Sequence, residues 1–245
     1  MENFGICHLS VTPVRKNPDS KYELVSQILY GEIFKIIEKR EKWSKILINY
    51  DKYEGWVNNT QIKFIDEKKF NIIKSINSVY CNDINGYIID EKNEKTFVPI
   101  GSLISSCKEL KSKYVGESSL KKSTIIKTAK KYLNSPYLWG GRIHFGIDCS
   151  GFSQIVYKIN GIKIKRDANQ QATQGYKTNL KDLKPGDLAF FGDKNKSVTH
   201  VGIMLNKNKI IHAFGKIRID KVNEIGIVNS DTKKLTHKLT EFRSY

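Results

Sequence analysis

The sequence lacks any long apolar run. No stretch approaches the ~18–20 apolar residues that a membrane-spanning helix needs, and the mean hydropathy is −0.45. The first seven residues contain no basic segment followed by an apolar stretch, so we expect neither a signal peptide nor a lipoprotein leader. We therefore expect a cytoplasmic protein with no membrane partner. An extracellular or cell-wall location is the alternative.

Cysteine is scarce, and its spacing is uninformative for metal or disulfide frameworks. The four cysteines are Cys7, Cys81, Cys107 and Cys149, and no two have Cys-x-x-Cys spacing. A disulfide scaffold is improbable at this density, and no Cys/His cluster has zinc-finger spacing. Reduced thiols fit best, three of them as ordinary buried residues.

Acidic residues are few relative to basic ones. Lys and Arg number 42 against 25 Asp and Glu, which gives a net charge of +17. Such a balance is attractive to polyanions. The lysines are scattered rather than striped, however, which favours a generally solvated basic surface, and we expect no nucleic-acid partner. A hydrophobic content of 39% in 245 residues excludes wholesale disorder and allows one to three domains.

The first half of the chain has the pattern of β structure. Short β-branched runs separated by turns are expected to form strands at residues 25–29, 33–37, 43–48 and 55–57. Their order and turn residues resemble bacterial SH3-like domains over residues 8–65. A second SH3-like module is expected from about 70 to 114, with strands at 78–80, 86–89 and 97–103, followed by a polar linker at 111–122.

From about residue 119 the pattern becomes helical and then returns to strands. Apolar residues at helical spacing predict a helix from about 125 to 133, capped by Ser119 or Ser123 and broken at Pro136. A second amphipathic helix follows residue 149 and ends at 160–161, and strands are expected at 188–191, 200–205 and 209–214. This order predicts an α+β domain.

The predicted fold is therefore multidomain. Two small all-β SH3-like barrels, at residues 1–66 and 67–118 with the linker, precede an α+β domain at 119–245.

Cys149 lies between a glycine-rich loop at 139–142 and the start of the second helix. At a helix N-terminus, unpaired N–H groups and the helix dipole favour a thiolate, which is the nucleophile of acyl transfer. The same N–H groups can form an oxyanion hole. A buried structural cysteine is the competing interpretation.

Two histidines supply a candidate base and its partner. His200 and His212 lie on successive expected strands joined by a turn at 206–208. If the turn centres on Asn206, the two residues are directly opposite on one sheet face. His200 could then take the thiol proton while His212 fixes its tautomer. From spacing alone, a zinc site formed by Cys149, His200 and His212 stays an alternative.

Separate blocks in the second half together carry a family resemblance. The blocks are NSPYLWGG at 134–141, DCSGF at 148–152, LKPGDLAFF at 183–191, HVGI at 200–203 and IIHA at 210–213. In this order they resemble the NlpC-type bacterial cysteine peptidases over about residues 121–218. The resemblance implies a papain-like α+β fold, a Cys149–His200–His212 triad, no cofactor or metal, and hydrolysis of peptidoglycan stem peptides.

The segment RDANQQ at 166–171, behind SH3-like domains, resembles the dipeptidyl-peptidase VI subgroup. That resemblance implies cleavage of the γ-D-Glu–diamino acid bond in peptides with a free N-terminal L-Ala. It implies that Asp167 holds the substrate ammonium and that Tyr137 lies beside the nucleophile. The remaining substrate-binding candidates, implied in the same way, are Asp148, Ser150, Glu32 and Tyr53. Ala168 departs from the serine that is often found at its position.

The resulting expectation is a cytoplasmic cysteine endopeptidase that recycles L-Ala-γ-D-Glu-diamino acid peptides. A carboxylate near a free amine would reject acylated peptides, because its charge would be left desolvated and unpaired. One alternative is an exported hydrolase of the intact wall, and another is a wall-peptide binding protein with a vestigial triad. Diaminopimelate and Lys are both open as the diamino acid.

Overall fold

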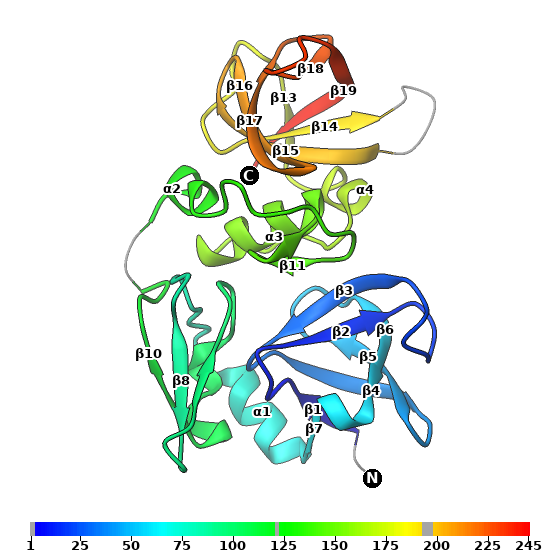
Figure 1. Cartoon of the computed structure of the whole chain (residues 1–245), viewed down its shortest axis with the longest axis vertical. Helices are drawn as coiled ribbons and strands as arrows, with labels where there is room; N and C mark the ends of the chain where they lie inside the picture. The colour runs from blue at the N-terminus through cyan, green and yellow to red at the C-terminus, as the bar shows by residue number, and fades with distance from the viewer. Residues whose placement is uncertain (1–2, 121–122, 193–197) are drawn as a thin grey trace. The chain divides into compact units, whose positions relative to one another are not determined.

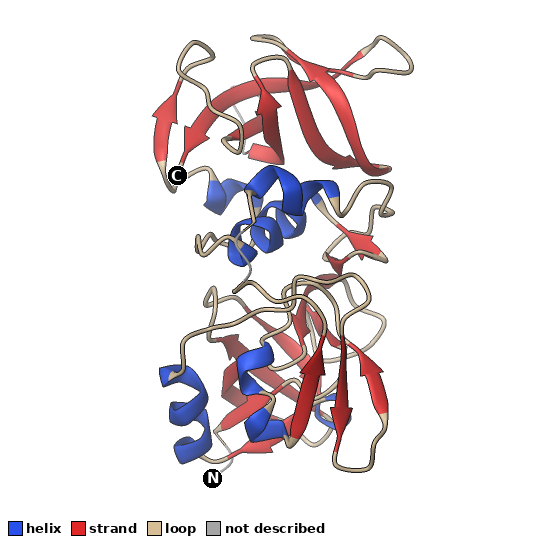
Figure 2. Ribbon diagram, turned by 90° about the vertical axis from the view of Figure 1, so that its left-hand side faces the viewer, coloured by secondary structure: helices blue, strands red, loops and turns tan. Residues whose placement is uncertain are grey.

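The computed structural model describes residues 3–120, 123–192 and 198–245. The chain forms two compact units, Met1–Lys122 with Trp139–Ile143, and Ser123–Leu138 with His144–Tyr245. Figures 1 and 2 show strands in both units, and helices that are few and short. Among the described residues, no helix has the length and apolar character that crossing a membrane requires.

The first unit begins with a seven-stranded antiparallel sheet in the order β3-β2-β6-β5-β4-β1-β7. Its strands are β1 (Phe4–Ile6), β2 (Val11–Arg15), β3 (Leu24–Leu29), β4 (Ile33–Lys39), β5 (Trp43–Ile48), β6 (Glu54–Asn58) and β7 (Lys63–Ile65). In β5 every second residue is buried, as expected for a strand with one face on a core. The strand positions predicted from the sequence agree with β3 to β6.

The second part of the first unit differs from the all-β expectation. It begins with helix α1 (Glu67–Ser75), which Asp66 caps by accepting a hydrogen bond from the Lys69 amide at 2.7 Å. Phe70 and Ile73, at helical spacing, are buried in the core. The prediction of β structure throughout residues 1–118 was wrong here. One capping residue and two apolar residues three apart are too weak a signal to identify a helix from the sequence.

A three-stranded sheet follows α1, in the order β10-β8-β9. Its strands are β8 (Tyr87–Asp90), β9 (Lys95–Phe97) and β10 (Ser112–Val115), and short 3-10 helices lie at Asn59–Gln61, Ile104–Ser106 and Lys108–Leu110. The strand expected at 78–80 is reduced to isolated bridges at Tyr80 and Cys81. A second SH3-like barrel at 67–118 stays a prediction, as do the boundaries at 66 and 118.

The second unit contains six strands that close on themselves in the order β19-β14-β15-β16-β17-β18, with β18 pairing back to β19 (Figure 1). Its strands, with β13 added beside β19, are β13 (Tyr176–Thr178), β14 (Leu188–Gly192), β15 (Val198–Asn206), β16 (Lys209–Phe214), β17 (Lys216–Val222), β18 (Gly226–Val228) and β19 (Leu235–Ser244). Their inward side chains include Phe191, Met204 and Ile210. The expected α+β order of this region is present.

Helices α2 (Ile125–Lys130), α3 (Cys149–Ile159) and α4 (Ala168–Gln171) complete the second unit, and the two-residue strands β11 (Arg142–Ile143) and β12 (Gly146–Ile147) precede α3. Thr124 caps α2, one residue after the expected Ser123. Helix α3 packs against α2, α4, β15 and β16. Every residue of α3 is buried, Lys158 included, so the helix predicted to be amphipathic is a central one.

Candidate active site

Cys149 is the first residue of α3, as predicted. Asp148 caps the helix by accepting a hydrogen bond from the Gly151 amide at 2.6 Å. Burial and the Asp148 carboxylate raise the pKa of the Cys149 thiol to about 12, while the backbone amide of Val201, the Arg166 guanidinium and the Ser150 amide act in the opposite direction. Burial therefore outweighs the helix N-terminus, and the thiol keeps its proton at neutral pH until a base removes it.

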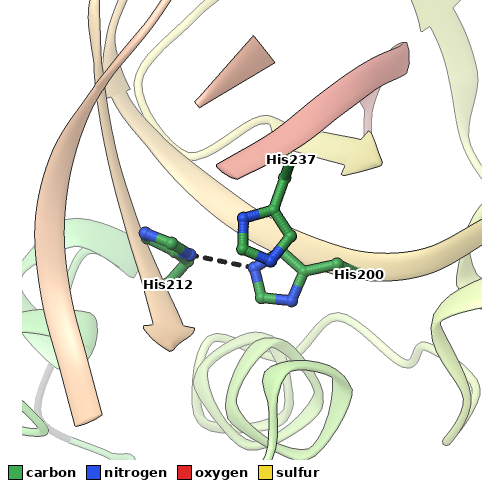
Figure 3. Close-up of side chains that lie close together, drawn as sticks. All are labelled: His200, His212 and His237. Carbon is green, nitrogen blue, oxygen red and sulfur yellow. Dashed lines mark hydrogen bonds between the residues drawn. The ribbon is translucent and has the colours of Figure 1, made fainter. Parts of the chain in front are cut away.

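The two predicted histidines meet, but not in the predicted register. Asn206 pairs with Lys209, so the turn centres on residues 207–208 rather than on Asn206. The register shift between Met204 and Asn206 then places His212 opposite Gly202 on β15. A two-residue offset keeps His200 and His212 on the same sheet face, where diagonal neighbours are within reach. Nε2 of His200 and Nδ1 of His212 lie 2.9 Å apart (Figure 3). Direct opposition was wrong, but the expected hydrogen bond is present.

Gly202 is the residue that makes this diagonal contact possible. A Cβ atom at residue 202 would lie 2.6 Å from Ile210 Cδ1 and 2.8 Å from His212 Cβ, closer than real Cβ contacts allow. A side chain there would push His212 off its position.

Asp220 extends the pair into a chain of three. Its Oδ2 lies 3.0 Å from His212 Nε2 and accepts a hydrogen bond from Arg218 Nε at 2.7 Å, while Oδ1 accepts from the Ser230 amide at 2.8 Å. Burial alone would raise the pKa of Asp220, but the hydrogen bonds from His212, Arg218 and Ser230 bring it below its usual range. Asp220 is therefore ionised at neutral pH.

This chain assigns the imidazole protons. An ionised Asp220 only accepts hydrogen bonds, so it holds the His212 proton on Nε2 and leaves Nδ1 as an acceptor. His200 then donates from Nε2, and its lone pair stays on Nδ1. Burial, with His212 and His237 beside it, lowers the pKa of His200 well below 6.5, so His200 is a neutral base at neutral pH.

A third histidine, His237, lies beside this pair. It comes from β19, and its ring stacks on the His200 ring with centroids 4.1 Å apart and planes at 23° (Figure 3). Neither Asp220 nor His237 was identified from the sequence, because strands β17 and β19 were not predicted. The available signal for β17 was the alternation of polar and apolar residues in the segment 216–222, which follows the predicted strand of His212.

Arg166 organises the residues that flank the nucleophile. Its Nη2 donates to Asp148 Oδ2 at 2.6 Å, and its Nη1 donates to the Ser150 hydroxyl at 2.8 Å. All three side chains are buried. Asp148 and Ser150, the predicted substrate ligands, thus lie at the start of α3 as expected and already bind a guanidinium. Their contact with substrate stays a prediction.

Tyr137 and Asp167 belong to the second unit, as do Cys149, His200 and His212. Burial raises the pKa of Tyr137 to about 12, and the charges of Cys149 and Asp148 add to the shift. The predicted position of Tyr137 beside the nucleophile stays a prediction. Asp167 is the N-cap of α4 and forms a capping box with Gln170. That arrangement is a structural role, and the contact of Asp167 with an ammonium group stays a prediction.

Glu32 and Tyr53 belong to the first unit. Glu32 is buried and forms a two-pronged ion pair with Arg142, with contacts of 2.9 and 3.1 Å, and accepts from the Leu29 amide at 2.8 Å. Tyr53 packs against the buried core of the first sheet. These contacts are structural, and the substrate-binding roles of both residues stay predictions.

Comparison with known proteins identifies both parts of the chain. Residues 134–236 match the NlpC/P60 family, and residues 14–62 match the bacterial dipeptidyl-peptidase SH3 domain. A Bacillus cereus protein named gamma-D-glutamyl-L-lysine dipeptidyl-peptidase is 30% identical over 224 residues, covering 78% of this chain and 67% of the relative. A Bacillus subtilis protein of the same name is 28% identical over 214 residues, covering 77% of this chain and 71% of the relative.

A solved structure shares the fold. The crystal structure of an NlpC/P60 family protein from Bacillus cereus matches with a TM-score of 0.79 and 20% identity, covering 99% of both chains. These matches confirm an SH3-like domain ahead of an NlpC-type peptidase domain.

Proposed function

This chain belongs to the NlpC/P60 family of cysteine peptidases, and we propose that it cleaves the γ-D-Glu–diamino acid bond of peptidoglycan stem peptides that carry a free N-terminal L-Ala. The observation that carries the chemistry is the buried chain from Asp220 through His212 to His200, in the same unit as a thiol at a helix start. The substrate is supported by the two relatives named gamma-D-glutamyl-L-lysine dipeptidyl-peptidase, which match across more than the peptidase domain.

In the proposed reaction, Nδ1 of His200 takes the Cys149 proton as the sulfur attacks the γ-glutamyl carbonyl carbon. The negative charge that forms on the carbonyl oxygen is held by backbone N–H groups at the start of α3. The C–N bond breaks, His200 returns its proton to the leaving diamino acid amine, and a thioester forms on Cys149. Water, deprotonated by His200, then releases L-Ala-D-Glu.

Charge distribution in the site supports this order of events. The thiol and His200 are both neutral at rest, because burial acts on both. The transient imidazolium on His200 is stabilised through His212 by the ionised Asp220. We assign Asp220 as a positioning residue, since it acts on His200 only through His212.

We assign the recognition of the free amine to Asp167, at the N-terminus of α4. A carboxylate aimed at an ammonium group stabilises the free peptide and penalises an acylated one. L-Ala is amide-linked to muramic acid in the intact wall, so the proposed substrate is a released peptide. We therefore propose a recycling role in the cytoplasm.

Hydrolysis of the intact wall is the second candidate. The net charge of +17 favours it, because a basic surface is attracted to anionic wall polymers. Digestion of intact sacculi, compared with digestion of free tripeptide, separates the two functions.

The test is mass spectrometry of L-Ala-γ-D-Glu-meso-diaminopimelate and L-Ala-γ-D-Glu-L-Lys after incubation with the protein. Release of L-Ala-D-Glu, lost in Cys149→Ala and retained in the control Cys107→Ala, is the expected result. Absence of cleavage of either peptide, or undiminished cleavage by Cys149→Ala, would overturn the proposal. Release of peptide fragments from intact sacculi would favour the second candidate.

A further inference from the structure

We propose that His200, His212 and His237 form a binding site for a soft divalent metal ion, with Zn²⁺ the preferred occupant, and that metal binding switches the peptidase off. One potential ligand nitrogen from each ring lies within 4.8 Å of the others. The rings come from three different strands, β15, β16 and β19, and Figure 3 shows them gathered at one point. The metal-binding part is independent of the proposed function, whereas the inhibitory part rests on it.

The hydrogen bonds on the outer side of two rings orient them for a metal. His212 Nε2 contacts Asp220 at 3.0 Å, which leaves Nδ1 with a lone pair directed at His200. The Thr236 hydroxyl donates its proton to the Ile227 carbonyl at 3.3 Å, so it accepts from His237 Nδ1 at 2.9 Å and leaves Nε2 with its lone pair. Metal-bound histidines usually have such partners on their other nitrogen, a carboxylate or an oxygen, because these fix the tautomer and ring orientation.

The spacing is close to that of a tetrahedral zinc site. Zinc–nitrogen bonds of about 2.0–2.1 Å at tetrahedral angles place ligand nitrogens about 3.3 Å apart. His200 Nε2 and His212 Nδ1 are now 2.9 Å apart in a hydrogen bond, and the His200 and His237 rings stack with planes at 23°. Metal binding therefore replaces that hydrogen bond and requires side-chain rotation that directs the three lone pairs at one ion. Three imidazoles with a fourth position left for water is an arrangement that zinc accepts. Imidazole also selects against Mg²⁺, which prefers oxygen ligands.

Inhibition follows from the position of the His200 proton. In the catalytic tautomer, Nε2 carries the proton and Nδ1 carries the lone pair that accepts the thiol proton. A metal ion on Nε2 takes that nitrogen's lone pair, so the proton of the neutral ring must lie on Nδ1. His212 and His237 already have the required tautomers. The net result is one proton moved between the two nitrogens of His200, no change of oxidation state, and a base that can no longer accept a proton.

A zinc ion bridging Cys149 and His200 is the rival arrangement. It would inhibit equally well, because thiolate and imidazole are both good zinc ligands. It would not require His237, and it would require the sulfur. These two requirements separate the two sites.

The experiment is isothermal titration of the full chain with ZnCl₂, alongside peptide cleavage with and without zinc. We expect one tightly bound zinc ion per chain, with Cys149→Ala binding zinc within about threefold of the wild-type affinity.

His237→Gln and His237→Phe, the latter keeping the stacked ring, should bind zinc at least ~100-fold more weakly, since even the loss of an outer-shell partner costs ~10–100-fold in affinity. Each variant is compared with its own metal-free cleavage rate, and zinc should no longer lower that rate. His8→Gln, in the first unit, is the matched control and should behave as the wild type.

Co²⁺ supplies a second readout in the Cys149→Ala variant. A visible band of tetrahedral cobalt that disappears with His237→Gln is expected. The proposal is overturned if Cys149→Ala abolishes binding, which would assign the metal to the Cys149–His200 pair. It is also overturned if the His237 variants bind Zn²⁺ as the wild type does. Titration reports on the metal site even if no peptide is cleaved.

Discussion

At the scale of single residues, catalysis depends on where protons reside at rest. The Cys149 thiol and the His200 imidazole are both neutral, because burial disfavours the charged form of each. Both groups are therefore uncharged at rest, and in the proposed mechanism proton transfer accompanies nucleophilic attack. In that mechanism Asp220, buried and ionised behind His212, stabilises the positive charge that the transfer places on His200.

The acid limb of the pH profile reports on His200. A base whose pKa is lowered stays neutral, and therefore active, at pH values below its ordinary 6.5, and activity is lost only as the pH falls through the lowered pKa. We expect the acid limb of kcat/KM to lie below pH 6.5. An acid limb above pH 6.5 would show that His200 is not the base or that it rests as an imidazolium.

Substitution of Asp220 tests its positioning role. Asp220→Asn removes the charge behind His212, and we expect kcat to fall about tenfold or more with KM nearly unchanged, since the charge matters only in the transition state. Asp231→Asn is the matched control, because Asp231 also binds Arg218, at 2.8 Å, but is exposed. A rise in KM with kcat unchanged in Asp220→Asn would assign the residue to substrate binding instead.

At the scale of elements, strand register decides which side chains meet. The strands carrying His200 and His212 could be predicted from β-branched runs and a turn, and so could the helix that begins at Cys149. Register could not, because the shift between Met204 and Asn206 leaves no mark in the hydrophobic pattern. Asp220 and His237 escaped prediction for a related reason, since they act only through pairing of strands that were not identified.

The Gly202 contact makes a testable claim about that register. Gly202→Ala forces a Cβ against Ile210 and His212, and we expect a loss of about 1–3 kcal/mol in the free energy of unfolding together with reduced kcat. Gly161→Ala is the comparison, because Gly161 has φ of +78° and a Cβ atom there would have no neighbour within 4 Å. It should lose stability, by about 1–2 kcal/mol, and keep kcat. Urea unfolding and steady-state kinetics measure both; a fully active, fully stable Gly202→Ala would refute the contact.

At the scale of the whole molecule, an SH3-like domain and an NlpC-type peptidase domain lie on one strongly basic chain. This domain order and the peptidase family could be predicted, because short motif blocks carry them. The helix α1 could not, because its cap and two apolar residues are too local a signal to outweigh the surrounding strands.

We expect kcat/KM for the acidic tripeptide to fall several-fold as salt rises from about 20 to about 200 mM, because screening shortens the range of the protein's positive field. A neutral amide derivative of the same peptide should respond much less. Equal salt dependence for both peptides would show that the net charge of +17 plays no part in substrate capture.

The central claim is that Cys149 acts on released peptides selected by their free amine. The most direct test compares kcat/KM for L-Ala-γ-D-Glu-meso-diaminopimelate with that for its N-acetyl derivative, in the wild type and in Asp167→Asn. We predict at least ~100-fold preference for the free amine in the wild type, since acylation leaves a charged group unpaired, and a much smaller preference in Asp167→Asn. Equal cleavage of the two peptides by the wild type would contradict the account.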